Sequence, residues 1–576
     1  MKSIKSKDIS NLIIGISCIL LINYIGSMLF FRLDLTEEKR FTLSDQTIAL
    51  LDSLDEELSI KVYLEGDLNP GFLRLRNETE EMLQEFEAYA NGNLVYEFIN
   101  PYDLGGKPEK VFQDLANQGL QPTNLETKEE GGLKQQYIIP GALMYYQNRK
   151  LPIQLLKSEL NLPAEFVLNK SIESIEFELT NTVRKLIKNQ REKVGFLTGH
   201  GEIEDNEIWD AASGLNEYYQ TLAISGDSIT QQQITIVDRV NLKNKDGQVL
   251  VDALNDYQGL IVAKPMDQFD DNELVVLDQF IMNGGKVMWC IDATTIDMDS
   301  LTSGLYTMAF PRKTRLEEML YAYGARLNQN LVQDLQCGYI PVFVGYEGNQ
   351  PKYKRSPWYY NPLITTNNEH LIVTNLDPIK TSFVSSIDTI PVPDVKKSIL
   401  LSTTKNSKNL RVPVRVSLQT AIRQPDLNKY TKGRQTIAVL LEGEFDSFFK
   451  NRLVSKGSKQ AKKKSVPTKM IVIADGDVIK NEVNSEGNPF PLSYDKYYNN
   501  IAYDNKKFIL NAMNYLMGDE DLIPIRSRRI VLRLLDGKTI KENKDTIVLL
   551  NTALPILLVL LSGVIAIYRR KRKYAK

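Results

Sequence analysis

The chain has 576 residues, of which 43% are hydrophobic and 25% charged, and its net charge at pH 7 is −2. This is the composition of a globular protein of several domains, and the near-neutral charge gives no reason to expect nucleic acid as a partner. Three cysteines exclude a disulfide framework and a cysteine-rich metal site, but they leave open one disulfide between Cys290 and Cys337.

Two long apolar segments lie near the ends of the chain. Residues 9–31 form the first and residues 546–568 the second, and each is long enough to cross a bilayer as a helix. A basic cluster at 569–576 directly follows the second segment, and basic flanks mark the cytoplasmic side because they resist translocation. The sequence therefore predicts two transmembrane helices, cytoplasmic termini at 1–8 and 569–576, and an extracytoplasmic region from 32 to 545.

A cleaved signal peptide is the competing interpretation of the first segment. Its apolar core is too long for a signal peptide, and it has no small-residue cleavage site. Ile16, Ser17 and Cys18 faintly resemble a lipoprotein processing site, yet the apolar run continues well past Cys18. An uncleaved anchor is therefore the favoured interpretation, with lipidation as the minor alternative.

Residues 32–190 are expected to form the first extracytoplasmic domain. The expected elements are a helix capped by Ser44, a strand at 58–64, a helix starting at Asn77, a strand at 94–99, a helix at 108–118, a hairpin of 137–146 with 150–156, and a longer helix over 172–186. This order resembles a thioredoxin-like domain. The loop after the first strand has no cysteine, so thiol redox chemistry is excluded there.

Residues 191–545 are expected to form a larger α/β domain. The expected elements are strands at 193–198, 260–263 and 286–291, helices at 208–219, 271–283 and 505–517, and further helix and strand signals at 436–441 and 470–477. Strands that are apolar throughout favour a parallel sheet covered on both faces, of the amidotransferase-like or flavodoxin-like kind. Residues 336–435, rich in proline, tyrosine and β-formers, are expected as a β-rich insertion, and the basic run 455–465 as a solvated loop.

Four stretches carry a resemblance to a known family: DLTEEKRFTLSDQT, FLTGHGE, IVIADGDVIKNE and NNIAYDNKKFILNAMNYLMGDEDLIPIRSR. In this order they resemble the gliding-motility-associated ABC transporter proteins of the GldG type and the wider group of ABC-transporter auxiliary proteins. The resemblance spans nearly the whole chain. It implies a subunit of the bacterial inner membrane, with its bulk in the periplasm, that works with a GldF-type permease and a GldA-type ATPase. It identifies no ligand and does not show gliding itself.

The residues themselves give little support for catalysis. No GxxxxGK[ST] segment occurs, so ATP hydrolysis must come from another polypeptide. His200, followed by Gly201 and Glu202 at the end of a strand, could act as a base, but a glycine turn with a locally bonded histidine is the favoured alternative. A hydrolase would need Cys290, which lies in an apolar strand without a nucleophile elbow, or the remoter Cys337.

We therefore expect a non-catalytic protein without cofactor or metal. A membrane-tethered hydrolase and a cell-envelope scaffold without a transport role are the alternatives. The segment Asp475-Gly476-Asp477 could offer oxygens to a cation, but a strand-terminating turn is favoured because no EF-hand pattern surrounds it.

Two groups of residues are candidate contact sites. The first is a surface for an envelope ligand or protein, for which core packing is the competing explanation of the aromatic residues; its members are His200, Glu202, Tyr353, Arg355, Trp358, Tyr359 and Tyr360. The second comprises the polar, small and proline residues of the second apolar segment, which would dock on a permease rather than face lipid alone; its members are Asn551, Thr552, Pro555, Ser562 and Gly563.

Overall fold

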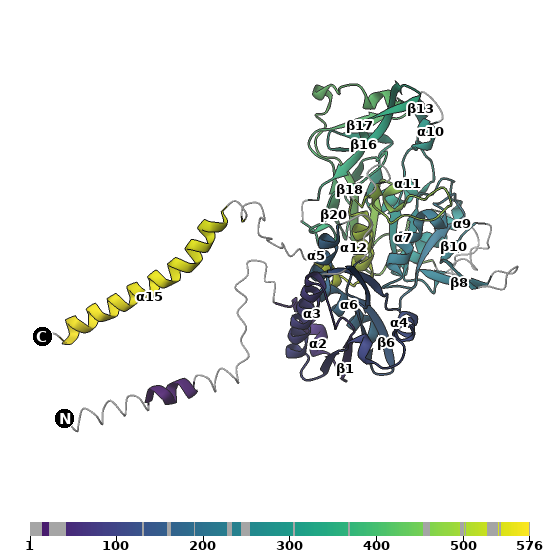
Figure 1. Cartoon of the computed structure of the whole chain (residues 1–576). Helices are drawn as coiled ribbons and strands as arrows, with labels where there is room; N and C mark the ends of the chain where they lie inside the picture. Colours follow the sequence, from purple (N-terminus) through teal and green to yellow (C-terminus); the bar gives the residue numbers. More distant parts are fainter. Residues whose placement is uncertain are drawn as a thin grey trace. The chain divides into compact units, whose positions relative to one another are not determined.

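The computed structural model separates into two compact units, residues 1–35 with 41–529 and residues 36–40 with 530–576. Both units are drawn in Figure 1. The structure describes residues 14–21, 42–129, 132–157, 163–188, 191–226, 233–243, 254–302, 306–366, 369–452, 461–495, 500–501, 503–526, 540 and 543–574.

A four-stranded sheet forms the centre of the N-terminal part of the larger unit, which is called the N-terminal domain below. Its strands lie in the order β2-β1-β5-β6, with β1 parallel to β2 and antiparallel to β5. Buried and half-buried side chains alternate along β1, as in a strand with one buried face. The predicted hairpin is confirmed, because β5 and β6 pair across the turn at residues 147–148. The bounds are β1 (Leu58–Val62), β2 (Leu94–Phe98), β5 (Gly141–Tyr146) and β6 (Arg149–Gln154).

The strand expected over 137–146 is two strands. β4 ends at Ile138 and pairs with β3, and β5 begins at Gly141. Pro140 lies between them and has no N–H to donate to a ladder. The further elements of this domain are α2 (Asp45–Asp52), α3 (Pro70–Tyr89), η1 (Pro101–Asp103), α4 (Pro108–Asn117), β3 (Thr123–Glu129), β4 (Gly132–Ile138), α5 (Ala164–Glu173) and α6 (Ile175–Ile187).

Two helix boundaries in this domain differ from the prediction. The helix expected from Asn77 starts at Pro70, because Asn69 caps it by accepting a hydrogen bond from the amide of Phe72 at 3.0 Å. The single helix expected over 172–186 is two helices, α5 and α6, which meet at Ser174.

A seven-stranded sheet forms the centre of the remaining part of the same unit, which is called the α/β domain below. The order is β10-β7-β11-β12-β24-β23-β20, and the first five strands are parallel. β23 and β20 are antiparallel, so the expectation of a parallel sheet holds for only part of it. No helix is described between β23 and β24, and antiparallel neighbours need no helical crossover. The bounds are β7 (Val194–Thr198), β10 (Arg239–Asn241), β11 (Gly259–Ala263), β12 (Lys286–Cys290), β20 (Val395–Ser402), β23 (Thr436–Gly443) and β24 (Thr468–Ile473).

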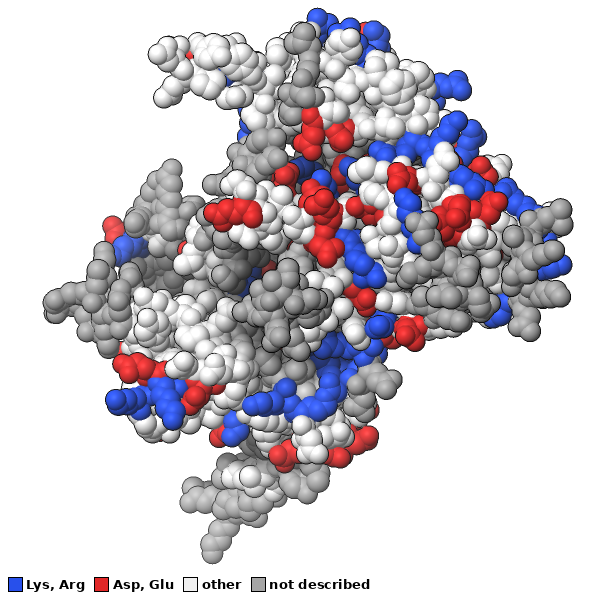
Figure 2. All heavy atoms as spheres, turned by 90° about the vertical axis from the view of Figure 1, so that its right-hand side faces the viewer, with Lys and Arg blue, Asp and Glu red and all other residues white. Residues whose placement is uncertain are grey.

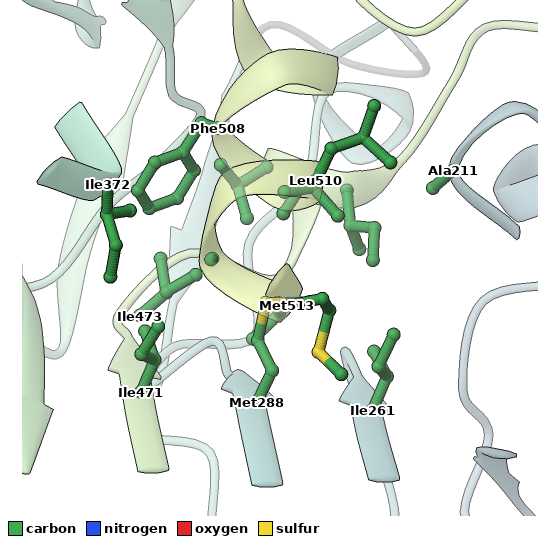
Figure 3. Packing of buried hydrophobic residues seen from close by; sticks show 14 of the residues in the cluster. Ala211, Ile261, Met288, Ile372, Ile471, Ile473, Phe508, Leu510 and Met513 are labelled. Carbon is green, nitrogen blue, oxygen red and sulfur yellow. The ribbon is translucent and has the colours of Figure 1, made fainter. Parts of the chain in front are cut away.

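Helices cover both faces of this sheet, as the apolar strands predict. On one face, α12 (Asn505–Met517) and α7 (Asp205–Leu215) pack on alternate strand residues such as Ile261 and Met288 (Figure 3). On the other face, α9 (Asp271–Met282) and α11 (Leu316–Tyr323) pack on intervening residues such as Val262 and Trp289. Every residue of β11 is buried, which is why its sequence shows no polar alternation.

The segment between α11 and β23 is β-rich. Its longest feature is a hairpin of β16 (Cys337–Glu347) and β17 (Gln350–Ile364), which packs in an apolar cluster of its own with Trp358 and Tyr360. β20 also lies in this segment but belongs to the central sheet. The smaller elements of the domain are β8 (Leu222–Gly226), β9 (Gln233–Val237), α10 (Asp299–Thr302), β13 (Thr307–Ala309), β14 (Ala325–Leu327), β15 (Asn330–Asp334), η2 (Leu371–Val373), β18 (Ile379–Lys380), β19 (Ile387–Thr389), β21 (Ser407–Arg411), β22 (Val414–Val416), η3 (Leu418–Ala421), η4 (Leu427–Lys429), η5 (Asp477–Ile479), β25 (Tyr494–Asp495), β26 (Asn500–Ile501) and α13 (Leu522–Arg526).

The second unit contains α15 (Lys544–Tyr574), whose residues 544–572 are long and apolar enough to cross a membrane. None of this span is buried. Of the first predicted span, 9–31, only residues 14–21 are described, and they are helical. The remainder of that span and residues 455–460 of the basic run lie outside the described residues.

Candidate functional site

The carboxyl ends of four parallel strands place polar side chains along one edge of the central sheet. β7 leads into His200, β11 into Lys264, β12 into Asp292, and β24 into Asp475 and Asp477. Because β7, β11, β12 and β24 are neighbours in the sheet, these residues come together although they are far apart in the chain. In open parallel sheets this edge is where ligands bind.

Lys264 is the centre of a buried ion cluster at this edge. Its Nζ lies 2.5 Å from Oδ1 of Asp477 and 3.4 Å from Oδ2 of Asp292. Gly476 donates its amide to the other oxygen of Asp292 at 2.6 Å. A Cβ at Gly476 would lie 2.6 Å from Cγ of Lys264, so the close approach of the two segments needs glycine here. Lys264 itself has a φ of 56°, a strained conformation of the kind that is often found at functional sites.

Asp475 lies beside this cluster and is fully buried. Its oxygens accept hydrogen bonds from the amides of Asp477 at 2.8 Å and Ser382 at 2.9 Å. Burial raises the pKa of Asp475 well above its ordinary value, and the nearby carboxylates of Asp477 and Asp292 add to the effect more than the two amides oppose it.

The pKa values of the ion pair are shifted by the same two effects. Burial by itself lowers the pKa of Lys264, but the carboxylates of Asp292 and Asp477 outweigh it and hold that pKa above its ordinary value. Burial raises the pKa of Asp292, although Lys264 opposes the increase. Lys264 therefore supplies the positive charge that stabilises the carboxylates buried at this edge of the sheet.

His200 forms a second buried cluster. Its Nε2 lies 3.0 Å from Oε2 of Glu273, its Nδ1 lies 3.6 Å from Oε1 of Glu202, and its ring stacks on Phe269 at 3.7 Å. Glu273 also completes the capping box of α9 with Asp270. Burial lowers the pKa of His200, but the two glutamates outweigh it, so the net pKa is raised. The imidazole ties the turn after β7 to the start of α9.

The two polar side chains of the GHGE segment, those of His200 and Glu202, both lie below the surface. The side chains of His200 and Glu202 are 0% exposed. Gly199 and Gly201 have φ values of 114° and 73°, which is the permissive backbone that the turn interpretation requires. His200 and Glu202 therefore do not form an exposed contact surface.

The cysteines are not arranged for nucleophilic chemistry. Cys290 and Cys337 are both buried free thiols, so the disulfide that the sequence left open is not formed. Burial raises the pKa of each thiol, and a raised pKa disfavours the reactive thiolate. Cys290 belongs to β12, which β11 separates from the strand that leads to His200.

A cavity of about 370 Å³ opens beside Lys264 and Asp477. Its other walls come from α7, the segment before α10, the β-rich segment and the start of α12. Most of its lining side chains are polar or charged, namely Glu207, Lys264, Asp297, Asp299, Asn361, Lys380, Thr381, Ser382, Asp477, Lys480, Asn481, Glu482, Ser493, Tyr494 and Asn505, and the remainder are Met298, Ile340, Val483 and Leu492. Among the described residues, no group of three or more histidine, cysteine, aspartate or glutamate side chains is arranged to hold a metal ion.

The aromatic stretch of the β-rich segment divides into buried and exposed parts. Trp358, Tyr359 and Tyr360 are buried, because both faces of this end of β17 are covered. Tyr353 is 59% exposed, and Arg355 stacks its guanidinium on Tyr339 of the neighbouring strand at 4.6 Å. An exposed surface formed by the whole aromatic stretch is therefore not present.

Sequence reasoning missed two parts of these sites. Lys264 and Asp292 were not singled out, although each is the first or second residue after the apolar end of a strand, and that position was the available signal. Tyr339 and Phe343 were also missed, and the period-2 pattern of β16 places both on its exposed side with Tyr353 opposite Phe343.

In α15 the five predicted docking residues occupy one side of the helix. At 100° per residue, Asn551, Pro555 and Ser562 fall on one stripe, and Thr552 and Gly563 on the adjacent one, within an arc of about 120°. The hydroxyl groups are satisfied within the helix, since Thr552 donates to the carbonyl of Val548 and Ser562 to that of Val559, each at 2.7 Å.

Comparisons with known proteins match most of the chain. A family described as an ABC-type uncharacterized transport system matches residues 191–512, and a domain family of unknown function matches residues 37–145. An uncharacterized protein of Borreliella burgdorferi (strain ATCC 35210 / DSM 4680 / CIP 102532 / B31) is 22% identical over 588 residues, covering 99% of each chain.

Two solved structures show only weak likeness. The N-terminal domain of mmIFT52 has a TM-score of 0.30 at 12% identity and covers 59% of this chain and 100% of its own. A ThuA-like protein from Parabacteroides merdae ATCC 43184 has a TM-score of 0.25 at 10% identity and covers 57% of this chain and 91% of its own. These scores are too low to carry an argument about fold or function.

Proposed function

Because the chain belongs to the family described as an ABC-type uncharacterized transport system, and is a transport-associated accessory protein, we propose that it is a non-catalytic extracytoplasmic subunit of an ABC transporter complex of the GldG type. Its partners would be a GldF-type permease and a GldA-type ATPase. The observation that carries the proposal is that one chain combines the matched α/β domain with a membrane-length helix.

The proposed topology has two spans in the bacterial inner membrane. Residues 544–572 supply the second span, and its basic end favours a cytoplasmic C-terminus. The first span, 9–31, is proposed from its apolar sequence and its length. Residues 32–545 then lie in the periplasm, with a thioredoxin-like N-terminal domain proposed on the strand order β2-β1-β5-β6.

The polar stripe of α15 supports a docking role for this helix. Asn551, Pro555 and Ser562 lie on one side, and the rest of the surface of residues 546–568 is mostly leucine, valine and isoleucine. A tether in lipid needs only apolarity, whereas polar and small residues on one side are what membrane helices use to approach each other. We therefore place the permease against this side.

A non-catalytic role is supported by the surroundings of the two candidate reactive groups. His200 is enclosed by two glutamates and Phe269, and the Cys290 thiol is fully buried. Neither reaches the cavity lining. These contacts favour structural roles over the hydrolase alternative.

A partner surface is proposed on the outer side of the β16–β17 hairpin. Phe343 and Tyr353 face each other across the strands with ring centroids 6.0 Å apart, and Tyr339 carries the stacked Arg355. Exposed aromatic residues beside arginine are typical of interface anchors. On the face in Figure 2 acidic and basic groups are interspersed, so neither sign forms a continuous field there.

Co-purification with the permease tests the proposal. The tagged full chain, extracted in mild detergent with its genomic neighbours expressed, is expected to recover a permease and an ATPase. A variant in which residues 546–568 are replaced by a leucine–alanine span of equal length should stay in the membrane but recover less permease. Absence of both proteins from the wild-type preparation would contradict the transporter role, and undiminished recovery by the variant would contradict docking through α15.

A further inference from the structure

The cavity beside Lys264 has bonding capacity that the protein itself does not use. Lys380 and Asn361 lie on the same side of the β17–β18 pair, because Lys380 pairs with Leu363, two residues from Asn361. Lys380 makes a cation–π contact with Tyr503 at 5.7 Å and has no ion-pair partner among the described residues. Asn361 accepts a hydrogen bond from Ser382 through Oδ1, which leaves its Nδ2 donor for another group.

Acidic groups line the same cavity. Asp297 accepts a hydrogen bond from the amide of Ser300 through Oδ1 at 2.7 Å, and its Oδ2 has no partner in the part of the chain that the structure describes. By contrast, the other two lysines of the lining are already paired, Lys480 with Glu207 at 2.7 Å and Lys264 with its aspartates. The cavity therefore offers the ammonium of Lys380 with the amide donor of Asn361, and the carboxylate of Asp297, which has no cation partner among the described residues.

The charge balance decides between ligand classes. Five acidic side chains and three lysines line the cavity, so a phosphate or nucleotide would meet more negative than positive charge. A neutral sugar would need aromatic faces to stack on, and Tyr494 is the one aromatic residue of the lining. A ligand with one anionic and one cationic end matches the mixed charge of the lining and needs no aromatic face to stack on.

We propose that this cavity binds a small zwitterion of the amino-acid or short-peptide class, with its carboxylate at Lys380 and Asn361 and its ammonium at Asp297. The volume of about 370 Å³ is within the range of small-molecule sites. The position at the carboxyl edge of the parallel strands is the one that open α/β sheets use for ligands. The inference gives the proposed accessory subunit a ligand, and binding to the purified chain is measured separately from recovery of the permease.

Isothermal titration of the purified full chain in detergent tests the proposal. The probes are alanylalanine, its N-acetyl derivative, which lacks the ammonium, and its C-terminal amide, which lacks the carboxylate. Alanylalanine is expected to bind about tenfold or more tightly than either derivative, since each charged hydrogen bond has that order of effect. Lys380→Gln should remove the preference over the amide, and Asp297→Asn the preference over the N-acetyl form.

Lys352→Gln is the matched control. Lys352 lies on the β16–β17 hairpin, is exposed, pairs with Glu347 and does not line the cavity. This variant should bind all three probes as the unaltered chain does. The proposal is overturned if alanylalanine does not bind up to about 10 mM, if it binds no better than its capped forms, or if well-folded Lys380→Gln and Asp297→Asn variants retain both preferences. Any of these results leaves permease recovery as an independent finding.

Discussion

Two buried carboxylate sites in the α/β domain meet the cost of burying charge in different ways. Asp278 in α9 is fully buried and is surrounded by neutral donors. At the edge of the sheet, Asp292 and Asp477 are instead held by the cation of Lys264. The neutral donors to Asp278 are the hydroxyls of Tyr323 and Ser447 at 2.7 Å, the amide of Phe448 at 2.8 Å and Nε2 of Gln279 at 3.0 Å.

The two sites differ in whether their charged groups have bonding capacity that faces a cavity. Asp278 has its hydrogen bonds inside the protein, where they join α9 to α11 and to the segment after β23, so its role is structural. Lys264 has strained backbone, and it lines a cavity together with Asp477. A buried charge is therefore a weak sign of function by itself, and the bonding capacity that faces a cavity is the better sign.

Removal of the cation should have the largest effect on stability. In Lys264→Met, Asp292 and Asp477 lose their counter-charge, which we expect to lower the unfolding free energy by about 3 kcal/mol, because breaking a buried pair is strongly destabilising and Asp477 is only partly buried. Urea denaturation would measure the loss. The double variant Lys264→Met/Asp292→Asn should regain part of it, and an unchanged denaturation midpoint in the single variant would contradict the ionic account.

Substitution of Asp278, whose partners are neutral donors, should lower the stability less. Asp278→Asn keeps the shape of the side chain but replaces an acceptor with a donor, so we expect a loss of about 2 kcal/mol from unsatisfied donors. Asp271→Asn on the same helix is the control, because Asp271 is 75% exposed and pairs at the surface with Arg315. Equal denaturation midpoints for these two variants would show that the hydrogen bonds of Asp278 contribute nothing distinctive.

Substitution of His200 should have an effect on stability that depends on pH. Its pKa is raised above 6.5 in the folded chain, so its stabilising contribution is fully present below pH 6.5 and is lost as the pH rises through the folded pKa. The stability difference between the unaltered chain and His200→Gln should therefore shrink as the pH rises above 6.5. Thermal unfolding over a pH series measures it, with His370→Gln as the comparison because burial lowers the pKa of His370. A difference that grows with pH would contradict the assignment.

The sequence predicted the layers of the α/β domain better than its site. Apolar strands of five residues, such as 259–263, indicate burial on both faces wherever they lie in a sheet. The antiparallel pairing of β23 and β20 depends on contacts that periodicity does not encode. The cluster of Lys264, Asp292 and Asp477 depends on strand order, because β24 lies beside β12 in the sheet, although β12 ends at Cys290 and β24 begins only at Thr468.

Local errors in prediction have local causes. The early start of α3 was signalled by Asn69 before Pro70, but the apolar spacing drew the boundary to Asn77. The burial of Trp358 and Tyr360 depends on tertiary packing with Phe383, which composition cannot show. The exposed partners Tyr339 and Phe343 become visible only once the register of the hairpin is known.

The smallest effect on stability is expected from substitution of Lys380. This prediction distinguishes a lysine whose charge stabilises the fold from a lysine whose charge is available to a ligand. Lys380 and Lys264 line the same cavity, but Lys380 has no carboxylate partner among the described residues, whereas Lys264 has two. Lys380→Gln leaves no buried charge unpaired, so its unfolding free energy should change by less than about 0.5 kcal/mol. The same urea series that detects the loss in Lys264→Met would measure it. If Lys380→Gln destabilises the chain as strongly as Lys264→Met, then Lys380 is part of the structural ion cluster, and its ammonium is not available to bind a ligand.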